Sequence, residues 1–387
     1  MTKEKGIPQI RFSGFTDTWE QREVSNVAMI STGGTPSTAI NEYWNPKQVP
    51  WLSSGEVHKK YITYTDDKIS NEGLNHSSAR MIKQNSVLIA LAGQGKTRGT
   101  VAINRISLST NQSIAAMTFA PDICPEFVFS NLESRYDELR KVSSGDGTRG
   151  GLNKQLVSEI QIPYTSLNEQ RKIGQFFTHL DRLITLHQRK YDKLTKVKKA
   201  MLEKMFPKNG SLYPEIRFKG FTDAWEQRKL EEVITVGNGM DYKHLSEGDI
   251  PVYGTGGYML SVDKALSYDK DAIGIGRKGT IDKPYVLKAP FWTVDTLFYC
   301  IPKEDYSLDF VYCIFQNVNW KEKDESTGVP SLSKVNINST DVKVPTLAEQ
   351  EKIGAYFAQL DNLITLHQRK LEKLKNIKKA CLEKMFV

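Results

Sequence analysis

Two stretches of the chain, residues 167–206 and 347–387, carry apolar residues at alternating spacings of three and four. Side chains at this spacing lie on one face of an α-helix and form the seam of a coiled coil. The first stretch has no internal proline and ends directly before Pro207, which cannot continue a helix. We therefore expect two helices of about 35 to 40 residues, roughly 50 to 60 Å long, that pack antiparallel.

The expected seam residues share this spacing, and a histidine occupies the same seam position in each stretch. They are Ile173, Phe177, Leu180, Ile184, His187 and Leu194 in the first stretch, and Ile353, Phe357, Leu360, Ile364, His367, Leu371 and Leu374 in the second. A polar residue in a coiled-coil seam sets register and orientation. We expect this role for both histidines rather than metal binding.

Outside these stretches the pattern changes to short apolar runs bounded by glycine and polar loops. Residues 85–103 and 271–287 each have the pattern of a strand, a Gly-rich basic loop and a second strand. Residues 143–163 and 325–345 each run from a Ser/Gly loop through a lysine into a strand that ends at proline. The pattern predicts two mixed α/β domains with a common fold.

The chain is internally duplicated. The sequence PQIRFSGFTDTWEQREV at residues 8–24 returns as PEIRFKGFTDAWEQRKL at residues 214–230. The 40 residues from Leu167 share 27 identities with the 40 residues from Leu347. Residues 26–160 and 232–342 share almost no identity. Near-identical elements make equivalent contacts, whereas divergent elements contact different partners, so one chain presents two different binding domains.

This order predicts the fold class, which is α+β: two mixed α/β recognition domains joined by two long helices that form an antiparallel coiled coil, with an internal pseudo-two-fold duplication. The expected boundaries follow the repeats. They place a first domain at 1–166, a helix at 167–206, a linker at 207–213, a second domain at 214–346 and a second helix at 347–387.

The charge is concentrated in the helices. The chain has a formal net charge of +8, and residues 169–206 hold ten Lys or Arg against four Asp or Glu. Residues 349–384 hold eight against five. The remaining chain is almost neutral, so a polyanion would be contacted through local groups rather than through a general basic field.

Composition and motifs exclude several classes of protein. The four cysteines form no CxxC pair, and no apolar run reaches the roughly 20 residues of a membrane helix. The start of the chain lacks the apolar core of a signal peptide, so we expect a cytoplasmic protein without a metal site. No Pro-Pro dipeptide of an amino-methyltransferase motif and no HExxH occur. The GQGKT sequence from Gly93 has Ala90 where a phosphate loop requires glycine, so we expect no cofactor and no catalysis in this chain.

These motifs resemble the specificity subunits of Type I restriction-modification enzymes, and the resemblance covers essentially the whole chain. It rests on the repeated IRFxGFTDxWE segment, the EQxKI start of each helix, and the GGTPS, YW and PWLSSG motifs between Ser31 and Val57. The family has Asp where this chain has Glu56. Gly276 to Thr280, followed by Trp292 and Asp295, is also similar to the family pattern.

The resemblance implies that each variable domain reads one half of a bipartite, asymmetric DNA sequence while the helices set the spacing. It also implies two methyltransferase subunits and two restriction subunits as partners. AdoMet, ATP and magnesium would be bound by those partners, and the methyltransferase would flip the target adenine out of the DNA duplex.

Residues that contact DNA need hydrogen-bonding or cationic side chains in loops or at strand ends. In the first domain we expect these to be Ser31, Thr35, Ser53, Ser54, Lys96, Thr97, Arg98, Asn111, Gln112, Arg149 and Lys154. In the second domain we expect Asn238, Tyr242, Lys243, Tyr253, Arg277, Lys278, Thr280, Thr293, Ser331 and Lys334. Trp44, Trp51 and Trp292 are expected to pack rather than to contact bases.

Two other classes of protein remain open at this stage. A coiled-coil assembly scaffold without DNA readout would also contain two long helices. A nuclease would require metal-dependent cleavage by the isolated chain. Divergent domains between near-identical connecting segments favour the two-site reader, because a scaffold with two equivalent sockets has no reason to vary them.

Overall fold

A computed structural model describes residues 6–93, 96–141, 151–208, 210–324 and 326–386 of the chain. The chain divides into two compact units. Unit 1 comprises Met1–His187 and Lys370–Val387, and unit 2 comprises Gln188–Arg369. The sequence predicted each long helix as a segment of its own, whereas in the structure each unit contains part of both helices.

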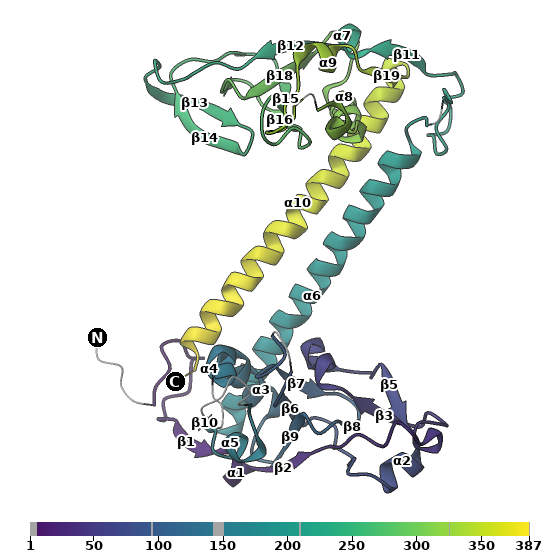
Figure 1. Cartoon of the computed structure of the whole chain (residues 1–387). Helices are drawn as coiled ribbons and strands as arrows, with labels where there is room; N and C mark the ends of the chain where they lie inside the picture. The colour runs from purple at the N-terminus through teal and green to yellow at the C-terminus, as the bar shows by residue number, and fades with distance from the viewer. Residues whose placement is uncertain (1–5, 94–95, 142–150, 209, 325, 387) are drawn as a thin grey trace. The chain divides into compact units, whose positions relative to one another are not determined.

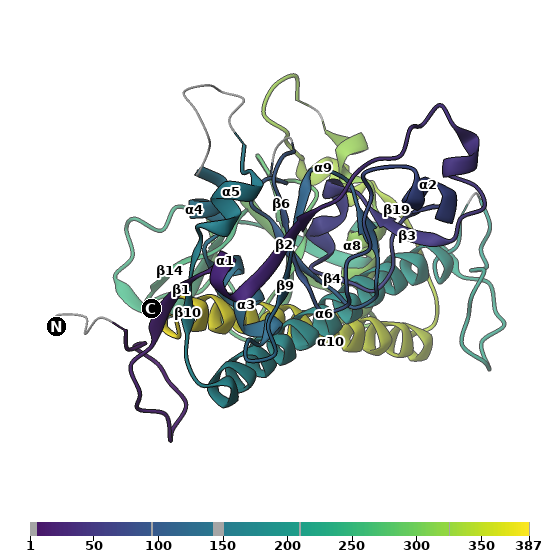
Figure 2. The same ribbon diagram turned by 90° about the horizontal axis from the view of Figure 1, so that it is seen from below.

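The centre of unit 1 is a five-stranded sheet with the strand order β2-β9-β6-β7-β4. Its strands are β2 (Ala28–Thr32), β4 (Tyr61–Ile62), β6 (Val87–Ala90), β7 (Val101–Asn104) and β9 (Ile114–Phe119). Figure 2 shows β2, β9 and β6 lying side by side. Every residue of β6 and β7 is buried, which explains why these strands have continuous apolar runs rather than alternation.

Smaller elements surround this sheet. A three-stranded sheet has the order β5-β3-β8, and β1 pairs with β10. The strands are β1 (Glu20–Glu23), β3 (Val49–Leu52), β5 (Asp67–Ile69), β8 (Ser109–Thr110) and β10 (Gln161–Tyr164). The short helices are α1 (Val24–Val27), η1 (Asn41–Tyr43), η2 (Ser54–Lys59), α2 (Asn71–Asn75), α3 (Pro125–Ser134), α4 (Tyr136–Lys141) and α5 (Lys154–Ser158). Residues of α3 pack in the same core as the sheet and the long helices (Figure 1).

Unit 2 repeats this plan with a different set of strands. A four-stranded sheet has the order β12-β18-β15-β16, a three-stranded sheet the order β14-β13-β17, and β11 pairs with β19. The strands are β11 (Glu226–Lys229), β12 (Ile234–Asn238), β13 (Glu247–Gly254), β14 (Gly257–Val262), β15 (Ala272–Gly276), β16 (Tyr285–Leu287), β17 (Trp292–Thr293), β18 (Leu297–Pro302) and β19 (Asp341–Val344). The short helices are α7 (Leu230–Val233), α8 (Leu308–Asn317), η3 (Trp320–Lys323) and α9 (Lys334–Asn338).

The expected long helices are present as α6 (Leu167–Lys204) and α10 (Leu347–Lys384). Within unit 1, Phe177 of α6 stacks on Phe386, just beyond α10, while Asp181 pairs with Lys378. Residue numbers thus rise along α6 as they fall along α10, so the two segments run antiparallel. Within unit 2, Lys198 pairs with Asp361 and the ring of Phe206 lies 6.5 Å from that of Phe357, which indicates the same direction.

The expected seam residues lie on the packed face of each helix, but the seam is not a simple contact between helices. Ile173, Phe177 and Leu180 are buried in a core that also contains Trp19 and Phe127. Ile353, Phe357 and Leu360 do the same in unit 2 with Trp225 and Phe310. The remaining expected seam residues are half-buried, apart from the buried Leu371: Ile184, His187, Leu194, Ile364, His367 and Leu374. The first turns of each helix therefore belong to a mixed core with the α/β domain.

The duplicated segments make the same contacts in both units. Arg11 donates two hydrogen bonds to the buried carboxylate of Glu169, and Arg217 does so to that of Glu349. Ile10 N donates to Lys384 O at 3.0 Å, and Ile216 N to Lys204 O at 2.9 Å. Identity between the repeats is explained at these positions by equivalent packing. The differences between the units lie in the segments between them.

Candidate DNA interface

In unit 1 the loop that follows β2 is held against β8 at a distance that only glycine allows. A Cβ at Gly33 would lie 1.9 Å from the carbonyl oxygen of Thr110. Gly34 N donates to that same oxygen at 2.8 Å, and the indole Nε1 of Trp51 donates to Gly34 O at 3.0 Å. The GGTP sequence is therefore a close backbone contact that fixes where the following residues emerge.

This contact brings several of the expected DNA-contacting residues together. Thr35 Oγ1 donates to Gln112 Oε1 at 2.7 Å. Asn111 N donates to Leu52 O at 3.0 Å, directly before Ser53. The chain segments that follow β2, β3 and β8 thus converge, and their exposed polar side chains form one surface. Ser31 lies on β2 itself and is only partly exposed.

Ser53 and Ser54 begin the short helix η2, and its conformation depends on the buried Glu56. One carboxylate oxygen of Glu56 accepts hydrogen bonds from Ser53 N and Ser53 Oγ, each at 3.2 Å. The other accepts from Lys59 Nζ at 2.7 Å and from Asp66 N at 2.9 Å. Glu56 therefore fixes the turn that presents the two serines.

The described cationic candidates of unit 1 lie in the loop after β6 and at the start of α5. Leu91 N donates to Ser113 O at 2.8 Å, which joins the loop after β6 to the residue following Gln112. In this loop Lys96 is exposed, whereas Thr97 and Arg98 are half-buried. The residues after Lys96 turn into β7, so the helix N-terminus of a phosphate loop does not follow them. Lys154 is exposed at the first position of α5, and Arg149 lies outside the described residues.

Unit 2 contains a corresponding loop contact around Gly239, built from different residues. We call the contacts around Gly33 and Gly239 the two corners. A Cβ at Gly239 would lie 1.9 Å from Val294 O, and Met240 N donates to Thr293 O at 2.8 Å. Trp292 Nε1 donates to Met240 O at 2.9 Å. The two tryptophans bond to equivalent carbonyls, yet Trp51 lies on β3 and Trp292 on β17. Both are buried, as expected, and Asn238 is exposed at the end of β12.

A second loop of unit 2 carries two exposed cations. Arg277 and Lys278 follow β15, and Arg277 N donates to Thr296 O at 2.7 Å. Lys278 forms an antiparallel bridge with Ser331, and Leu332 N donates to Arg277 O at 2.9 Å. The structure therefore brings Arg277, Lys278 and Ser331 together. Thr280 is half-buried, and Lys334 is exposed at the start of α9.

Aromatic candidates of unit 2 lie beside this corner. The ring of Tyr253 contacts those of Tyr258 and Tyr285, at centroid distances of 6.4 Å and 6.1 Å. Burial raises the pKa of Tyr285, whose hydroxyl donates to Gly254 O at 2.6 Å. Tyr242 is half-buried and Lys243 is exposed in the loop after Met240.

Thr293 does not fit the role that the sequence predicted for it. Its side chain is fully buried, and Oγ1 has no hydrogen-bond partner. The short strand β17 runs parallel to β13 in the interior, which places Thr293 beneath the surface rather than on it. A two-residue strand gives too little alternation for its inward side to be predicted.

The structure adds candidates that the sequence pattern missed. Ser78 and Ala79 pack against Gly34, so the exposed Arg80 that follows them lies next to the surface around Thr35. In unit 2, Tyr258 and Met259 are exposed on β14, which forms a hairpin with β13. Arg80, Tyr258 and Met259 belong to no local motif, and only the packing of distant segments reveals them.

The described residues contain no group of three or more His, Cys, Asp or Glu side chains that could hold a metal ion. Across the same ranges, no helix is long and apolar enough to cross a membrane. The corners described above offer hydrogen-bond donors, acceptors and cations on exposed loops. This chemistry suits recognition of a polar, anionic partner.

Comparisons with known proteins support this interpretation. The family model of the Type I restriction modification DNA specificity domain matches residues 16–196 and again residues 222–376. The chain is 25% identical over 231 residues to the Type I restriction enzyme MjaIX specificity subunit of Methanocaldococcus jannaschii, covering 57% of this chain and 52% of that protein. It is 25% identical over 166 residues to the EcoR124I/EcoR124II specificity subunit of Escherichia coli, covering 42% of this chain and 41% of that protein. The chain therefore spans about half the length of these two relatives.

Two further comparisons extend over nearly the whole chain. The MjaVIII specificity subunit of Methanocaldococcus jannaschii is 20% identical over 422 residues, with 97% of this chain and 94% of that protein covered. The crystal structure of the Type I restriction-modification S subunit from M. genitalium superposes with a TM-score of 0.72 at 16% identity, covering 98% of this chain and 99% of that one. The expected fold class is thus confirmed. Because the family model matches most of the chain in two copies, the chain belongs to the Type I restriction modification DNA specificity family.

Proposed function

We propose that this chain is the non-catalytic specificity subunit of a Type I restriction-modification complex, in which each unit reads one half of a bipartite, asymmetric DNA site. The observation that carries the proposal is the pair of equivalent corners at Gly33 and Gly239. In both, a glycine lies against a backbone carbonyl and a tryptophan indole donates to the carbonyl of the next residue, but the two corners present different side chains. Equivalent scaffolds with different exposed groups are what two half-sites of different sequence require.

The cations and polar groups divide between two tasks. Lys96, Arg98, Arg277 and Lys278 supply charge for phosphates or for guanine edges, since Arg and Lys pair with guanine O6 and N7. Thr35, Gln112 and Asn238 supply donors and acceptors at the centre of each corner. We propose that α6 and α10, each a continuous helix of 38 residues, set the spacing between the half-sites.

Exposed residues that are identical in both repeats support two copies of one protein partner. The sequence LITLHQRK occurs at residues 183–190 and again at 363–370. Within it Leu186 is 45% exposed and Leu366 is 44% exposed. Packing does not explain identity at such positions, but docking of the same surface twice does. We propose two methyltransferase subunits as these partners, with two restriction subunits in the full complex.

The partners would supply the chemistry. AdoMet, ATP and magnesium would be bound by the methyltransferase and restriction subunits.

The test is sequencing of DNA methylation in cells that express this chain with its methyltransferase subunit, compared with cells that express the methyltransferase subunit alone. We expect a new split motif with methyladenine in both halves. Arg98→Ala should alter the preference at one half-site only, and Arg277→Ala at the other. If the two proteins form a complex and no new methylation appears, the proposal is wrong and an assembly scaffold takes its place.

A further inference from the structure

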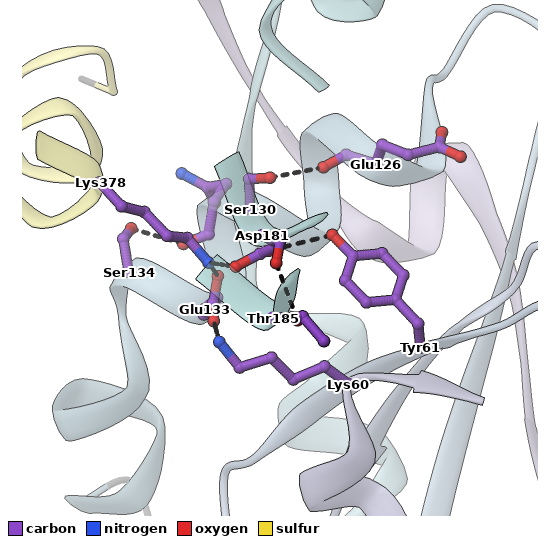
Figure 3. A network of polar contacts seen from close by, with 10 residues as sticks. Lys60, Tyr61, Glu126, Ser130, Glu133, Ser134, Asp181, Thr185 and Lys378 are labelled. Carbon is purple, nitrogen blue, oxygen red and sulfur yellow. Dashed lines mark hydrogen bonds and ion pairs between the residues drawn. The ribbon is translucent and has the colours of Figure 1, made fainter. Parts of the chain in front are cut away.

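A closed network of charged side chains joins both long helices to the α/β domain in unit 1 (Figure 3). Lys378 of α10 is buried, and its Nζ donates to Glu133 Oε2 of α3 at 2.5 Å and to Asp181 Oδ1 of α6 at 2.6 Å. The other oxygen of Glu133 pairs with Lys60. The other oxygen of Asp181 accepts a hydrogen bond from the Tyr61 hydroxyl at 3.0 Å.

Each charge of this network has an opposite partner. Burial would raise the pKa of the Glu133 carboxyl, but Lys60 and Lys378 outweigh burial and hold this pKa below its ordinary value. Burial would lower the pKa of Lys60, but the charges of Glu133 and Asp181 raise it above its ordinary value. Buried ion pairs add little net stability compared with apolar packing, whereas removal of one partner leaves a buried charge unpaired. The network therefore matters more for the positions of the side chains that it joins than for the net stability of the fold.

The network includes Lys60, which directly follows the turn of residues 53–59 that carries Ser53 and Ser54. Lys60 is the residue that ends η2, and its backbone has φ +61° and ψ −58°, a positive-φ conformation that non-glycine residues seldom adopt. Its carbonyl accepts a hydrogen bond from Ile103 N at 2.7 Å. Since Glu56 ties Ser53, Lys59 and Asp66 to one carboxylate, the turn has few internal degrees of freedom. Its orientation then depends on the packing of the buried Val57 and on how residues 60 and 61 are held.

We propose that the network of Lys60, Tyr61, Glu133, Asp181 and Lys378 positions the 53–59 turn for DNA recognition by unit 1. The helices α6 and α10 hold Lys60 and Tyr61 through Asp181, Glu133 and Lys378. Lys378, more than 300 residues away from Ser53 in sequence, is thereby a positioning residue for the first half-site. This inference rests on the proposed function and adds a specificity-determining role for a helix residue.

Unit 2 contains a lysine equivalent to Lys378, but among its described residues this lysine has no ion pair that connects it to a recognition loop. Lys198 pairs with Asp361 at 2.5 Å and lies 5.9 Å from the ring centroid of Tyr312. Gln316 of α8 occupies the position of Glu133, and its Oε1 is buried without a partner. The strand that corresponds to β3, β13, continues into a hairpin with β14 rather than into a short helix. Among the described residues of unit 2, no ion pair connects Lys198 to a recognition loop, so Lys198 is a matched control.

The experiment uses the complex of the full chain with its methyltransferase subunit. Rates of methylation are measured on the recognised DNA site and on sites with single base changes in either half, for wild type, Lys378→Met, Tyr61→Phe and Lys198→Met. The readout is the ratio of kcat/KM between the recognised and the altered site. A variant that only lowers the amount of folded complex changes both rates equally and leaves this ratio unchanged.

We expect Lys378→Met and Tyr61→Phe to reduce discrimination about tenfold in the half-site that Arg98→Ala affects, since small displacements of a positioned group have large effects on rate. The other half-site should keep its ratio, and Lys198→Met should leave both ratios at the wild-type value. Tyr61→Phe removes one hydroxyl and keeps the ring, so it tests the inference even if Lys378→Met does not fold.

Two results overturn the inference in distinguishable ways. If wild type reads a bipartite site and both variants keep their discrimination, or lose it equally in both halves, the network has no positioning role and the proposed function stands. If wild type shows no site-specific methylation, the proposed function fails and the inference fails with it.

Discussion

The buried carboxylates Glu169 and Glu349 give a quantitative test of how the repeats differ. Glu169 accepts hydrogen bonds from Arg11 Nε and Nη2 at 2.6 and 2.9 Å, from Trp19 Nε1 at 3.0 Å and from Thr165 Oγ1 at 2.6 Å. Burial would raise the pKa of Glu169, but these donors hold it below its ordinary value. Glu349 accepts only the two bonds from Arg217 among the contacts that the structure describes for it. Pro345 stands where the first repeat has Thr165, and Trp225 Nε1 has no partner.

The perturbation is Glu169→Met, with Glu349→Met as its matched control. Each variant leaves an arginine without its carboxylate, at a cost of about 3–5 kcal/mol. Only Glu169→Met also leaves the buried N–H of Trp19 and the hydroxyl of Thr165 without an acceptor, and a buried unpaired group costs about 1–3 kcal/mol. Because the Thr165 hydroxyl can rotate, we expect Glu169→Met to exceed its control by about 2 kcal/mol. That difference is a factor of about 30 in an equilibrium constant.

The assay is native-state hydrogen exchange with peptide-level mass spectrometry, because a chain with two units need not unfold in one step. The protection of residues 10–24 and 160–173 is measured in Glu169→Met, and that of residues 216–230 and 340–353 in Glu349→Met. Equal losses of protection, or a larger loss in the second unit, would refute the reasoning, because the additional donors around Glu169 would then have no energetic effect.

Two further predictions concern acid stability and the corner glycines. The pKa of Glu133 is depressed in the folded chain, so its contribution to the free energy of unfolding is present above the unfolded pKa of about 4.3 and is lost as pH falls through the lower folded value. Urea denaturation between about pH 5 and 3 should therefore show a shallower pH dependence of the free energy of unfolding for Glu133→Gln than for wild type. An unchanged slope would contradict this prediction. Gly239→Ala places a Cβ 1.9 Å from Val294 O, so it should lower the free energy of unfolding by about 1–3 kcal/mol and impair recognition of the half-site that depends on Arg277. Gly256→Ala, whose Cβ would have nothing within 4 Å, should change the free energy of unfolding by less than about 0.5 kcal/mol. Thermal unfolding and methylation of both half-sites check this pair, and similar effects of the two variants would contradict the argument.

The two long helices and the duplication could be predicted from the sequence. The helices follow from a local spacing of apolar residues, and the duplication follows from comparing the chain with itself. Alternating spacings of three and four place Ile173, Phe177 and Leu180 on one helix face whatever surrounds them. The repeated segments around Arg11 and Arg217 required equivalent contacts, although the sequence did not reveal that Glu169 and Glu349 are the partners. The buried roles of Trp51 and Trp292 also followed, since large aromatic side chains have much to gain from burial.

Tertiary structure alone decided the remaining features. The first turns of the seam pack against Trp19 and Trp225, because in each unit the helices also cover an α/β core. Thr293 is buried by a neighbouring strand that its own short segment does not predict. Lys378, Glu133 and Lys60 form one network although the chain separates Lys378 from Glu133 by 245 residues. Local patterns determine which face of an element is apolar, but charge pairing acts through space, and it depends on which distant elements the fold brings within a few ångströms.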